Sequence, residues 1–289
     1  QPRALALEPH QRYIDALPLP AAKGGAIEPL AKFIEPAEYL GYFSVNPDGD
    51  GTLRNIHLLA KMGEHVAPAL ALQVASVYHG ASILPLANEF YPNALGGIRF
   101  LLNGAEGKPD PVLPTDQSGR LLINFPGKPG SVFPRFSIGD IVEAMKPEVA
   151  AQALAAGTIS AAEAKRRSKL WTMLSSTVKN RVVLFGNTAI GTYDQRITPF
   201  SEFGPGVEIH AAAVQNILDG RYLKRPWYMA SLEALSMLGL AMLLGMIMSN
   251  VSVPMSFGAA LMGTGFWYLT DTEVLFPSGY WAHGVLATL

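Results

Sequence analysis

Residues 46–51 (NPDGDG) are the first stretch whose residue types could do chemistry. Oxygen-bearing side chains occupy every second position and a glycine follows, which matches the opening half of a calcium-binding loop. The ninth position of such a loop would be Arg54, whose charge repels a cation, and the twelfth, normally a glutamate, is His57. We therefore expect a turn shaped by Asn and Asp side chains here, in preference to a calcium site.

Residues 186–192 (GNTAIGT) are a second candidate, because their glycines have the spacing of a phosphate-binding loop. The lysine that should contact the phosphates is missing, since Thr192 directly follows Gly191. Asp194 comes two residues later and would repel an anion. We expect a glycine-rich turn after a strand in preference to a nucleotide site.

Asp194, Ser201 and His210 supply the side-chain types of a hydrolase triad, but no G-x-S-x-G elbow surrounds the serine. His210 lies on an apolar helical pattern, where we expect it to pack in the core or to bond a backbone group. Glu208 is two positions away and points to a different helix face, so the two do not form a metal pair. The sequence predicts no catalytic residue, no metal site and no cofactor.

Charge is scarce and unevenly distributed along the 289 residues. Charged residues make up 16% of the chain, against about 25% in typical soluble domains. All 22 Lys and Arg lie at or before Arg225, and only three acidic residues follow it. The net charge of −1 argues against a nucleic-acid partner, and the absence of cysteine excludes disulfides and thiolate chemistry. The pattern predicts a water-soluble part, residues 1–225, followed by a lipid-facing part, residues 227–289.

The apolar tail predicts two to three transmembrane helices, at about residues 227–249, 251–270 and 274–289. The first two segments are long enough to cross a hydrocarbon core of about 30 Å. A buried helical hairpin in a larger soluble core is the alternative. Basic residues occur before the first segment and none follow it, so the positive-inside rule would place the soluble part in the cytoplasm.

The soluble part alternates predicted helices and strands, which indicates an α/β fold. An unbroken apolar run between Lys179 and Gly186 is typical of a strand buried on both faces. Ser137 has the position of a helix N-cap. The other expected elements are a helix over 27–39, strands over 41–45 and 53–59, a helix over 67–78, a strand over 120–125, helical residues over 147–176 and a helix over 206–218.

Four segments, in this order and at these spacings, resemble the type-two CHASE domain, a sensory extracellular domain associated with cyclases and histidine kinases. The most specific is the last, where T-P-F is followed by P-G-V-E-I-H-A. The segments are residues 41–54 (GYFSVNPDGDGTLR), 121–127 (LLINFPG) with 133–140 (FPRFSIGD), 181–189 (RVVLFGNTA) and 194–211 (DQRITPFSEFGPGVEIHA).

The resemblance covers about residues 25–289 and implies a sensor outside the cytoplasmic membrane, followed by membrane helices that pass a signal inward. It contradicts the orientation from the positive-inside rule, and we follow the four matched segments. The family's leading membrane helix, its opening strand with an aspartate-rich motif and its output domain lie outside the matched part. The resemblance assigns no ligand to any residue.

The shared motifs are expected to be mainly structural. A sensory pocket, if present, is expected in the loop after the predicted buried strand, lined by Asn187, Thr188, Asp194 and Arg196. The residues expected to brace turns and helix entries are Asp48, Asp50, Arg54, Thr198, Pro199, Gly206, Glu208 and His210.

Two functions are favoured at this point, and an enzyme in its own right is the remaining alternative. The first is a signalling receptor in the inner membrane, with its soluble domain on the periplasmic side, a homodimeric or larger assembly, and a small-molecule or protein signal. The second is a non-catalytic structural or accessory subunit of an envelope complex. Asp194→Ala separates them, because a receptor would lose its response first and a structural loop would lose stability first.

Overall fold

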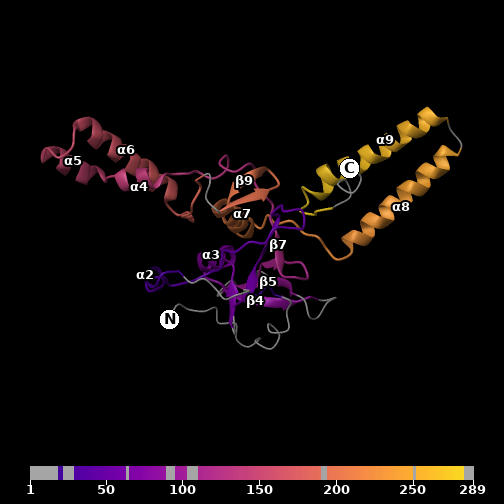
Figure 1. The fold of residues 1–289 in the computed structure, drawn as a ribbon, viewed down its shortest axis with the longest axis horizontal. Helices are drawn as coiled ribbons and strands as arrows, with labels where there is room; N and C mark the ends of the chain where they lie inside the picture. The colour runs from indigo at the N-terminus through magenta and orange to yellow at the C-terminus, as the bar shows by residue number, and fades with distance from the viewer. Residues whose placement is uncertain are drawn as a thin grey trace. The chain divides into compact units, whose positions relative to one another are not determined.

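The computed structural model describes residues 19–21, 29–62, 65–88, 95–102, 110–189, 194–249 and 252–282. The chain divides into two compact units. The colour in Figure 1 follows the residue number, so each unit can be located by its residues. One unit combines residues 1–125 with 210–289, and the other is residues 126–209.

In its described residues, the first part of unit one is built from short antiparallel sheets and the helices α2 and α3. Strands β1 and β7 pair, β2 pairs with β3, and β5 lies between β4 and β6. The bounds are α2 (Ala31–Ile34), β1 (Asn55–His57), β2 (Leu59–Met62), β3 (His65–Pro68), α3 (Leu70–His79), β4 (Ser82–Ala87), β5 (Leu95–Leu101), β6 (Val112–Pro114) and β7 (Arg120–Leu122).

The core of this part is aliphatic with one aromatic ring, Phe100. Helix α3 buries its small and aliphatic side chains, and it ends at Gly80, whose φ of 60° is the left-handed conformation that glycine adopts without a Cβ clash. The residues with the most deeply buried side chains include Leu53, Leu58, Leu59, Leu72, Leu95, Ile98, Leu113 and Leu121.

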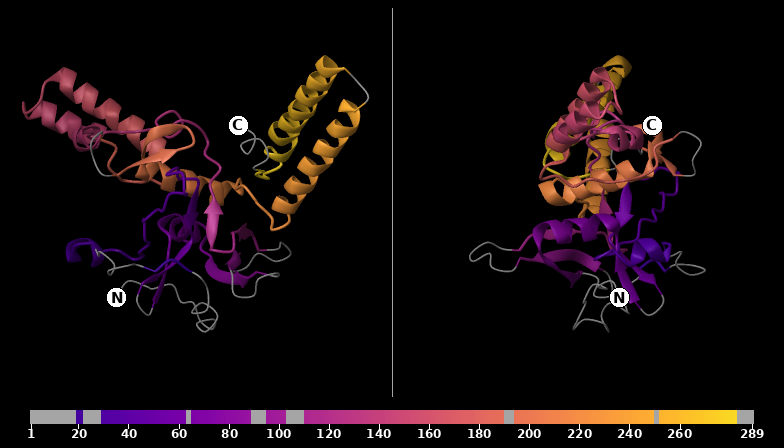
Figure 2. Two further views of the ribbon diagram at one scale, coloured as in Figure 1. Left: turned by 45° about the vertical axis from the view of Figure 1, so that its right-hand side comes forward. Right: turned by 90° about the vertical axis from the view of Figure 1, so that its left-hand side faces the viewer.

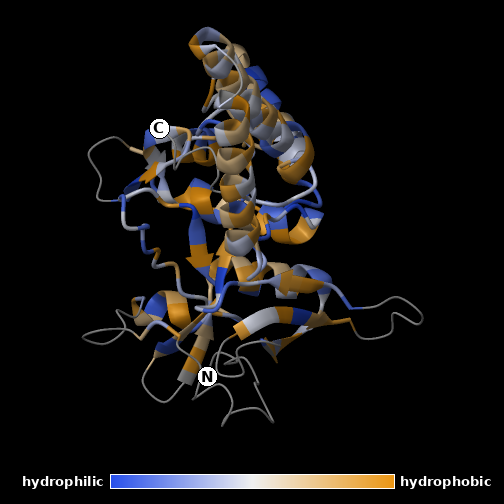
Figure 3. Cartoon of the chain, turned by 90° about the vertical axis from the view of Figure 1, so that its right-hand side faces the viewer, coloured by the Kyte–Doolittle hydropathy of each residue, from blue (hydrophilic) through white to orange (hydrophobic). Residues whose placement is uncertain are grey.

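The second part of unit one contains the apolar helices. Helices α8 and α9 lie side by side, as the left view of Figure 2 shows, and Leu240 of α8 packs on Gly263 of α9, where a Cβ would lie 2.8 Å from the leucine Cδ1. Figure 3 shows both helices dominated by hydrophobic residues. The bounds are α7 (Gly206–Asp219), which begins in unit two, α8 (Met229–Met248), α9 (Val253–Thr270) and a π-helical turn, η1 (Asp271–Leu275).

Within the part of the chain that the structure describes, only α8 is long and apolar enough, over Met229–Ile247, to cross a bilayer. Only 6% of that stretch is buried, so α8 is not a core helix. Helix α9 carries no charged residue in its 18 positions. Residues 276–282 of the third predicted segment form turns and a bridge in place of a helix, and residues 283–289 lie outside the described part.

The described residues of unit two form helices α4, α5 and α6, a β-hairpin and the first turn of α7. Ser137 caps α4 with a capping box, in which its Oγ accepts from the Asp140 N–H while the Asp140 carboxylate accepts from the Ser137 N–H. Ser160 caps α6 with a single bond, in which its Oγ accepts from the Glu163 N–H at 3.2 Å. The bounds are α4 (Ile138–Glu143), α5 (Pro147–Ala155), α6 (Ala161–Val178), β8 (Gln195–Thr198) and β9 (Ser201–Pro205).

The predicted mixture of helices and strands is confirmed, as are α3, the Ser137 cap, the helical residues after 147 and α7. The buried strand predicted for residues 179–186 is wrong. Val183 and Phe185 are 64% and 81% exposed, and these residues form neither a helix nor a strand. An apolar run is buried only if neighbouring strands cover it, and no described residue pairs with this one. The strand predicted for 41–45 is reduced to a single bridge between Tyr42 and Ala69.

Candidate functional site

The loop predicted to hold a ligand lies in unit two, on either side of residues outside the described part. The Asn187 carboxamide oxygen accepts from the Ala189 N–H at 3.0 Å, and Arg196 Nη1 donates to the Gln195 carbonyl at 2.9 Å. Both bonds join residues one or two positions apart, so they shape the loop and do not define a pocket. Gly191 and Thr192, from the predicted phosphate-loop spacing, lie outside the described residues.

Asp194 connects this loop to the start of α7. Its carbonyl accepts from the Gly206 N–H at 2.8 Å, and its carboxylate lies against the glycine, where a Cβ would be 2.3 Å from Oδ1. Any side chain at Gly206 would therefore push the Asp194 carboxylate away. The Asp194 side chain and the first residue of α7 are in direct contact.

The T-P-F motif is the turn of the β8–β9 hairpin. Thr198 pairs with Ser201, and its hydroxyl donates to the Ser201 carbonyl at 3.1 Å. Pro199 follows Thr198 in the two-residue loop, where its fixed φ favours a turn. The Ser201 hydroxyl accepts from the Phe203 N–H at 3.1 Å. This hairpin leads directly into α7.

Glu208, in the first turn of α7, joins two of the family segments. Its carboxylate accepts from Arg135 Nε at 2.6 Å and from the Gly130 N–H at 3.0 Å, and its side chain is only 12% exposed. Gly130 has a φ of +81°, and a Cβ there would be 3.3 Å from the Arg135 guanidinium carbon. The turn, the arginine and the carboxylate form one interlocked arrangement within unit two.

Farther along α7, in unit one, two buried side chains bind backbone groups. His210 Nε2 lies 2.9 Å from the Phe43 carbonyl oxygen, and because a carbonyl only accepts, Nε2 carries the proton. Asn216 accepts from the Asn124 N–H at 2.7 Å and donates to the Asn124 carbonyl at 2.9 Å. Asn124 and Asn216 were not among the predicted site residues. The available signal was an asparagine on the apolar face of a helix.

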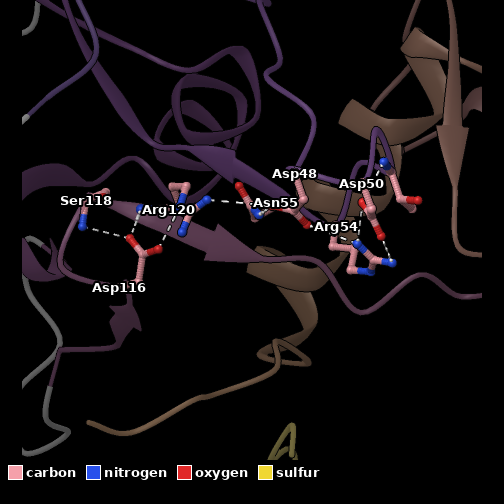
Figure 4. Close-up of polar contacts among 8 residues, drawn as sticks. Asp48, Asp50, Arg54, Asn55, Asp116, Ser118 and Arg120 are labelled. Carbon is pink, nitrogen blue, oxygen red and sulfur yellow. Dashed lines mark hydrogen bonds and ion pairs between the residues drawn. The ribbon is translucent and has the colours of Figure 1, made fainter. Parts of the chain in front are cut away.

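The acidic side chains of the turn at residues 46–51 are bound by an arginine. Arg54 donates to Asp50 at 2.7 and 3.0 Å and to Asp48 at 3.3 Å, as Figure 4 shows. The Arg54 hydrogen bond is the main reason that the pKa of Asp50 falls to about 2. The carboxylates that resemble a calcium loop are thus neutralised by a side chain of the same chain.

The charge pattern continues into β7. Arg120 Nη1 lies 3.6 Å from Asp48 Oδ1, and its Nε donates to Asp116 at 2.6 Å (Figure 4). Asp116 also accepts from the Arg120 N–H at 2.9 Å, which closes the turn before the strand. Acidic and basic side chains therefore alternate from the Asp50 turn to the Asp116 turn.

His57, in β1, lies near this network. Its pKa is lowered by burial and, to a smaller degree, by the charge of Arg120. Its carbonyl accepts a short hydrogen bond from the Tyr42 hydroxyl, and burial raises the pKa of that tyrosine. The neutral imidazole is therefore the favoured form in the folded protein.

These contacts define what the motif residues do. Their polar groups bind other groups of the same chain, and no set of three or more His, Asp or Glu side chains in the described residues is arranged to hold a metal. The described residues thus form a mixed helix and strand fold that is braced by internal pairs and is followed by one helix long and apolar enough to cross a membrane. The model of the CHASE2 domain matches residues 4–249, so the chain belongs to the CHASE2 family, a family of sensory extracellular domains in signalling receptors. No curated protein and no solved structure matches the chain.

Proposed function

We propose that the chain is the extracytoplasmic sensory and membrane-anchor region of a bacterial transmembrane receptor, which relays a signal to a cytoplasmic output such as an adenylate or guanylate cyclase or a histidine kinase. The observation that carries the proposal is helix α8. It begins ten residues after the last residue of α7, Asp219, and 6% of its apolar stretch is buried. A CHASE2 domain that leads directly into a lipid-exposed helix is suited to pass a change in the domain to the membrane.

In this proposal α8 and α9 both cross the inner membrane. Their domain-side ends carry aromatic pairs: Trp227 and Tyr228 precede α8, and Trp267 and Tyr268 lie near the end of α9. Trp and Tyr are the residues enriched at membrane interfaces. Two crossings return the chain to its starting side, so an output domain in the cytoplasm requires a third span. Residues 276–282, which belong to the third segment predicted from the sequence, form turns and a bridge in place of a helix, so the third span is not assigned to them.

The soluble part lies on the periplasmic side in this proposal, although basic residues precede α8. The structure weakens the argument from the positive-inside rule, because Arg225 is paired with Glu233 of α8. The pair neutralises one of the three basic residues nearest the helix. The rule also depends on flanking charge in loops on both sides, so the family's placement is preferred.

The signal is a small molecule or a protein that binds the loop of Asn187, Thr188, Asp194 and Arg196, and the receptor acts as a homodimer or a larger assembly. Support comes from the contact of Asp194 with the first residue of α7. A ligand that moves the Asp194 carboxylate alters the helix start without unfolding the β8–β9 hairpin. That displacement is the conformational change that a receptor needs.

A non-catalytic accessory subunit of an envelope complex is the second candidate. The observation that favours it is the internal pairing of the motif side chains, Arg54 with Asp50 and Arg135 with Glu208, which braces the fold without a ligand. Asp194→Ala discriminates the two. A receptor should lose its response and keep its unfolding midpoint, and an accessory subunit should lose stability first.

The experiment that tests the proposed function is the intact mass of the protein from its native membrane, with its terminal peptides. A mass far above 31.0 kDa with a C-terminal cyclase or kinase peptide supports the receptor. A mass near 31.0 kDa, without an output domain, contradicts it and leaves the accessory subunit as the better account.

A further inference from the structure

The two apolar helices of unit one are tied together at their domain-side ends by backbone pairing. The Lys224 N–H donates to the Gly279 carbonyl at 2.7 Å, and the Trp281 N–H donates to the Lys224 carbonyl at 3.0 Å. Leu223, one residue earlier, bridges to Leu122 of β7. The segment before α8 therefore lies between a strand of the domain and the segment that follows α9.

An ion pair closes this junction. Arg225 donates from Nη1 and Nη2 to the two carboxylate oxygens of Glu233, at 3.0 and 2.9 Å, in the fork geometry of a strong charge-assisted pair. Nη1 also donates to the Trp281 carbonyl at 3.2 Å, and the guanidinium lies 5.8 Å from the centre of the Trp281 ring. One arginine thus contacts the start of α8 and the segment after α9.

The pair is shielded from water, since the Glu233 side chain is 10% exposed and the Arg225 side chain 28%. No other charged residue occurs in the chain between Glu233 and Asp271. A carboxylate in an apolar helix costs free energy because it loses its hydration, and the ion pair with Arg225 offsets that cost. The pKa of Asp271 is raised by burial and, secondarily, by the charge of Glu233. Loss of the arginine would therefore remove the cation that offsets the charge of the shielded Glu233 carboxylate.

We infer that Arg225 and Glu233 form a latch that fixes α8 to the Lys224–Trp281 junction, so that α8, the segment after α9 and strand β7 move as one body when the receptor signals. This inference rests on the proposed receptor function and names the residues that couple the domain to its membrane helices. Arg225 and Glu233 are positioning residues in this scheme.

The latch is tested by hydrogen exchange of the full-length protein in lipid nanodiscs. Arg225→Ala and Glu233→Gln should each raise the exchange rates of the Lys224 and Trp281 amides about ten- to a hundredfold, because each removes the ion pair that joins Arg225 to α8 at a site shielded from water. The matched control is Lys224→Ala, which also removes one positive charge at the junction but leaves the Arg225–Glu233 pair intact; its amides other than 224 should keep wild-type rates. The exchanged pair Arg225→Glu with Glu233→Arg should restore most of the protection.

Two results would overturn the latch: unchanged exchange at both amides in the single variants, or no recovery in the exchanged pair. If Arg225→Ala unfolds the whole chain, Arg225→Lys tests the latch instead. This variant keeps the positive charge but loses the two parallel hydrogen bonds of the guanidinium group. The latch then predicts faster exchange confined to residues 222–225 and 279–281, and a uniform increase refutes it.

Basal output of the full-length protein is the second readout. It should change in Arg225→Ala and Glu233→Gln and recover in the exchanged pair. Altered exchange with unaltered output would refute the coupling role while leaving the receptor function standing. Absence of any output domain in the native protein would instead refute the receptor function itself.

Discussion

Replacement of Asn216 by alanine is expected to be among the most damaging single changes of a polar residue in the chain. The Asn216 side chain is 3% exposed and makes two hydrogen bonds to the Asn124 backbone, at 2.7 and 2.9 Å. Each buried group left without its partner costs about 1–3 kcal/mol. Asn124 is half-buried, so water replaces part of the loss, and we expect a total of about 2–3 kcal/mol. At about 2–4 °C per kcal/mol, the midpoint of thermal unfolding should fall by about 4–12 °C.

Asn216→Asp makes this prediction sharper. An ionised aspartate accepts from the Asn124 N–H but presents a second acceptor to the Asn124 carbonyl, so Asn216→Asp should be destabilised at neutral pH. A protonated carboxyl donates to that carbonyl, and burial favours the protonated form. The deficit should therefore shrink as the pH falls toward about 5, well above the usual aspartate pKa of about 3.9.

The assay is thermal unfolding in nanodiscs over a range of pH, with Asn187→Ala as the control, because Asn187 is exposed and bonds only a residue two positions away. The control should keep the wild-type midpoint. A midpoint for Asn216→Ala within about 2 °C of wild type, or a deficit in Asn216→Asp that does not depend on pH, would refute the two-bond account.

Three further predictions follow from single contacts. Gly41→Ala should destabilise the fold by about 1–3 kcal/mol in a denaturant titration, because the new Cβ would lie 2.8 Å from the Leu70 Cα, a backbone atom that cannot move aside; an unchanged midpoint would count against this contact. The lowered pKa of His57 predicts that its share of stability is complete above the unfolded pKa of 6.5 and is lost as the pH falls below it, so His57→Gln should flatten the pH dependence of unfolding in that range. Arg54→Gln should return the pKa of Asp50 from about 2 toward its ordinary value of 3.8, as followed by carboxyl NMR titration, and a pKa still near 2 would show that Arg54 is not its main cause.

Local features of the fold could be predicted from the sequence because their causes are close in the chain. Ser137 and Asp140 are three residues apart, and the capping box needs nothing else. Gly80 ends α3 because only glycine adopts its left-handed conformation without cost. The 3.6-residue apolar period located α7 for the same reason, and the length of the continuous apolar stretch located α8, since both patterns belong to the helix itself.

The strand predicted at residues 179–186 failed because its burial depended on partners that a single segment does not specify. The run from Val182 to Phe185 has the composition of a buried strand, yet its side chains alternate between half-buried and exposed, and no described strand pairs with it. Register and pairing are set by chain segments far apart in the sequence. The apolar run alone therefore predicts neither the register nor the pairing partner of this segment.

The contacts of the candidate site also divide into those between near neighbours in the sequence, which could be predicted, and those between distant segments, which could not. The Asp50–Arg54 pair spans four residues, so its bracing role could be expected from spacing. Arg135 meets Glu208 across 73 residues, and Asn124 meets Asn216 across 92, and no short-range pattern announces either contact. The ligand-binding role of the loop around Asp194 stays a prediction.

The most direct test of the central claim is the membrane topology of the chain, and the absence of cysteine makes it simple. Ala162→Cys places one thiol on the exposed surface of α6, and Ser249→Cys places one at the end of α8. A membrane-impermeant maleimide should label Cys at position 162, and not at 249, when only the outer membrane is permeabilised, and should label both after lysis. Labelling of 249 with protection of 162 would place the domain in the cytoplasm, and labelling of both before lysis would show that α8 does not cross the membrane.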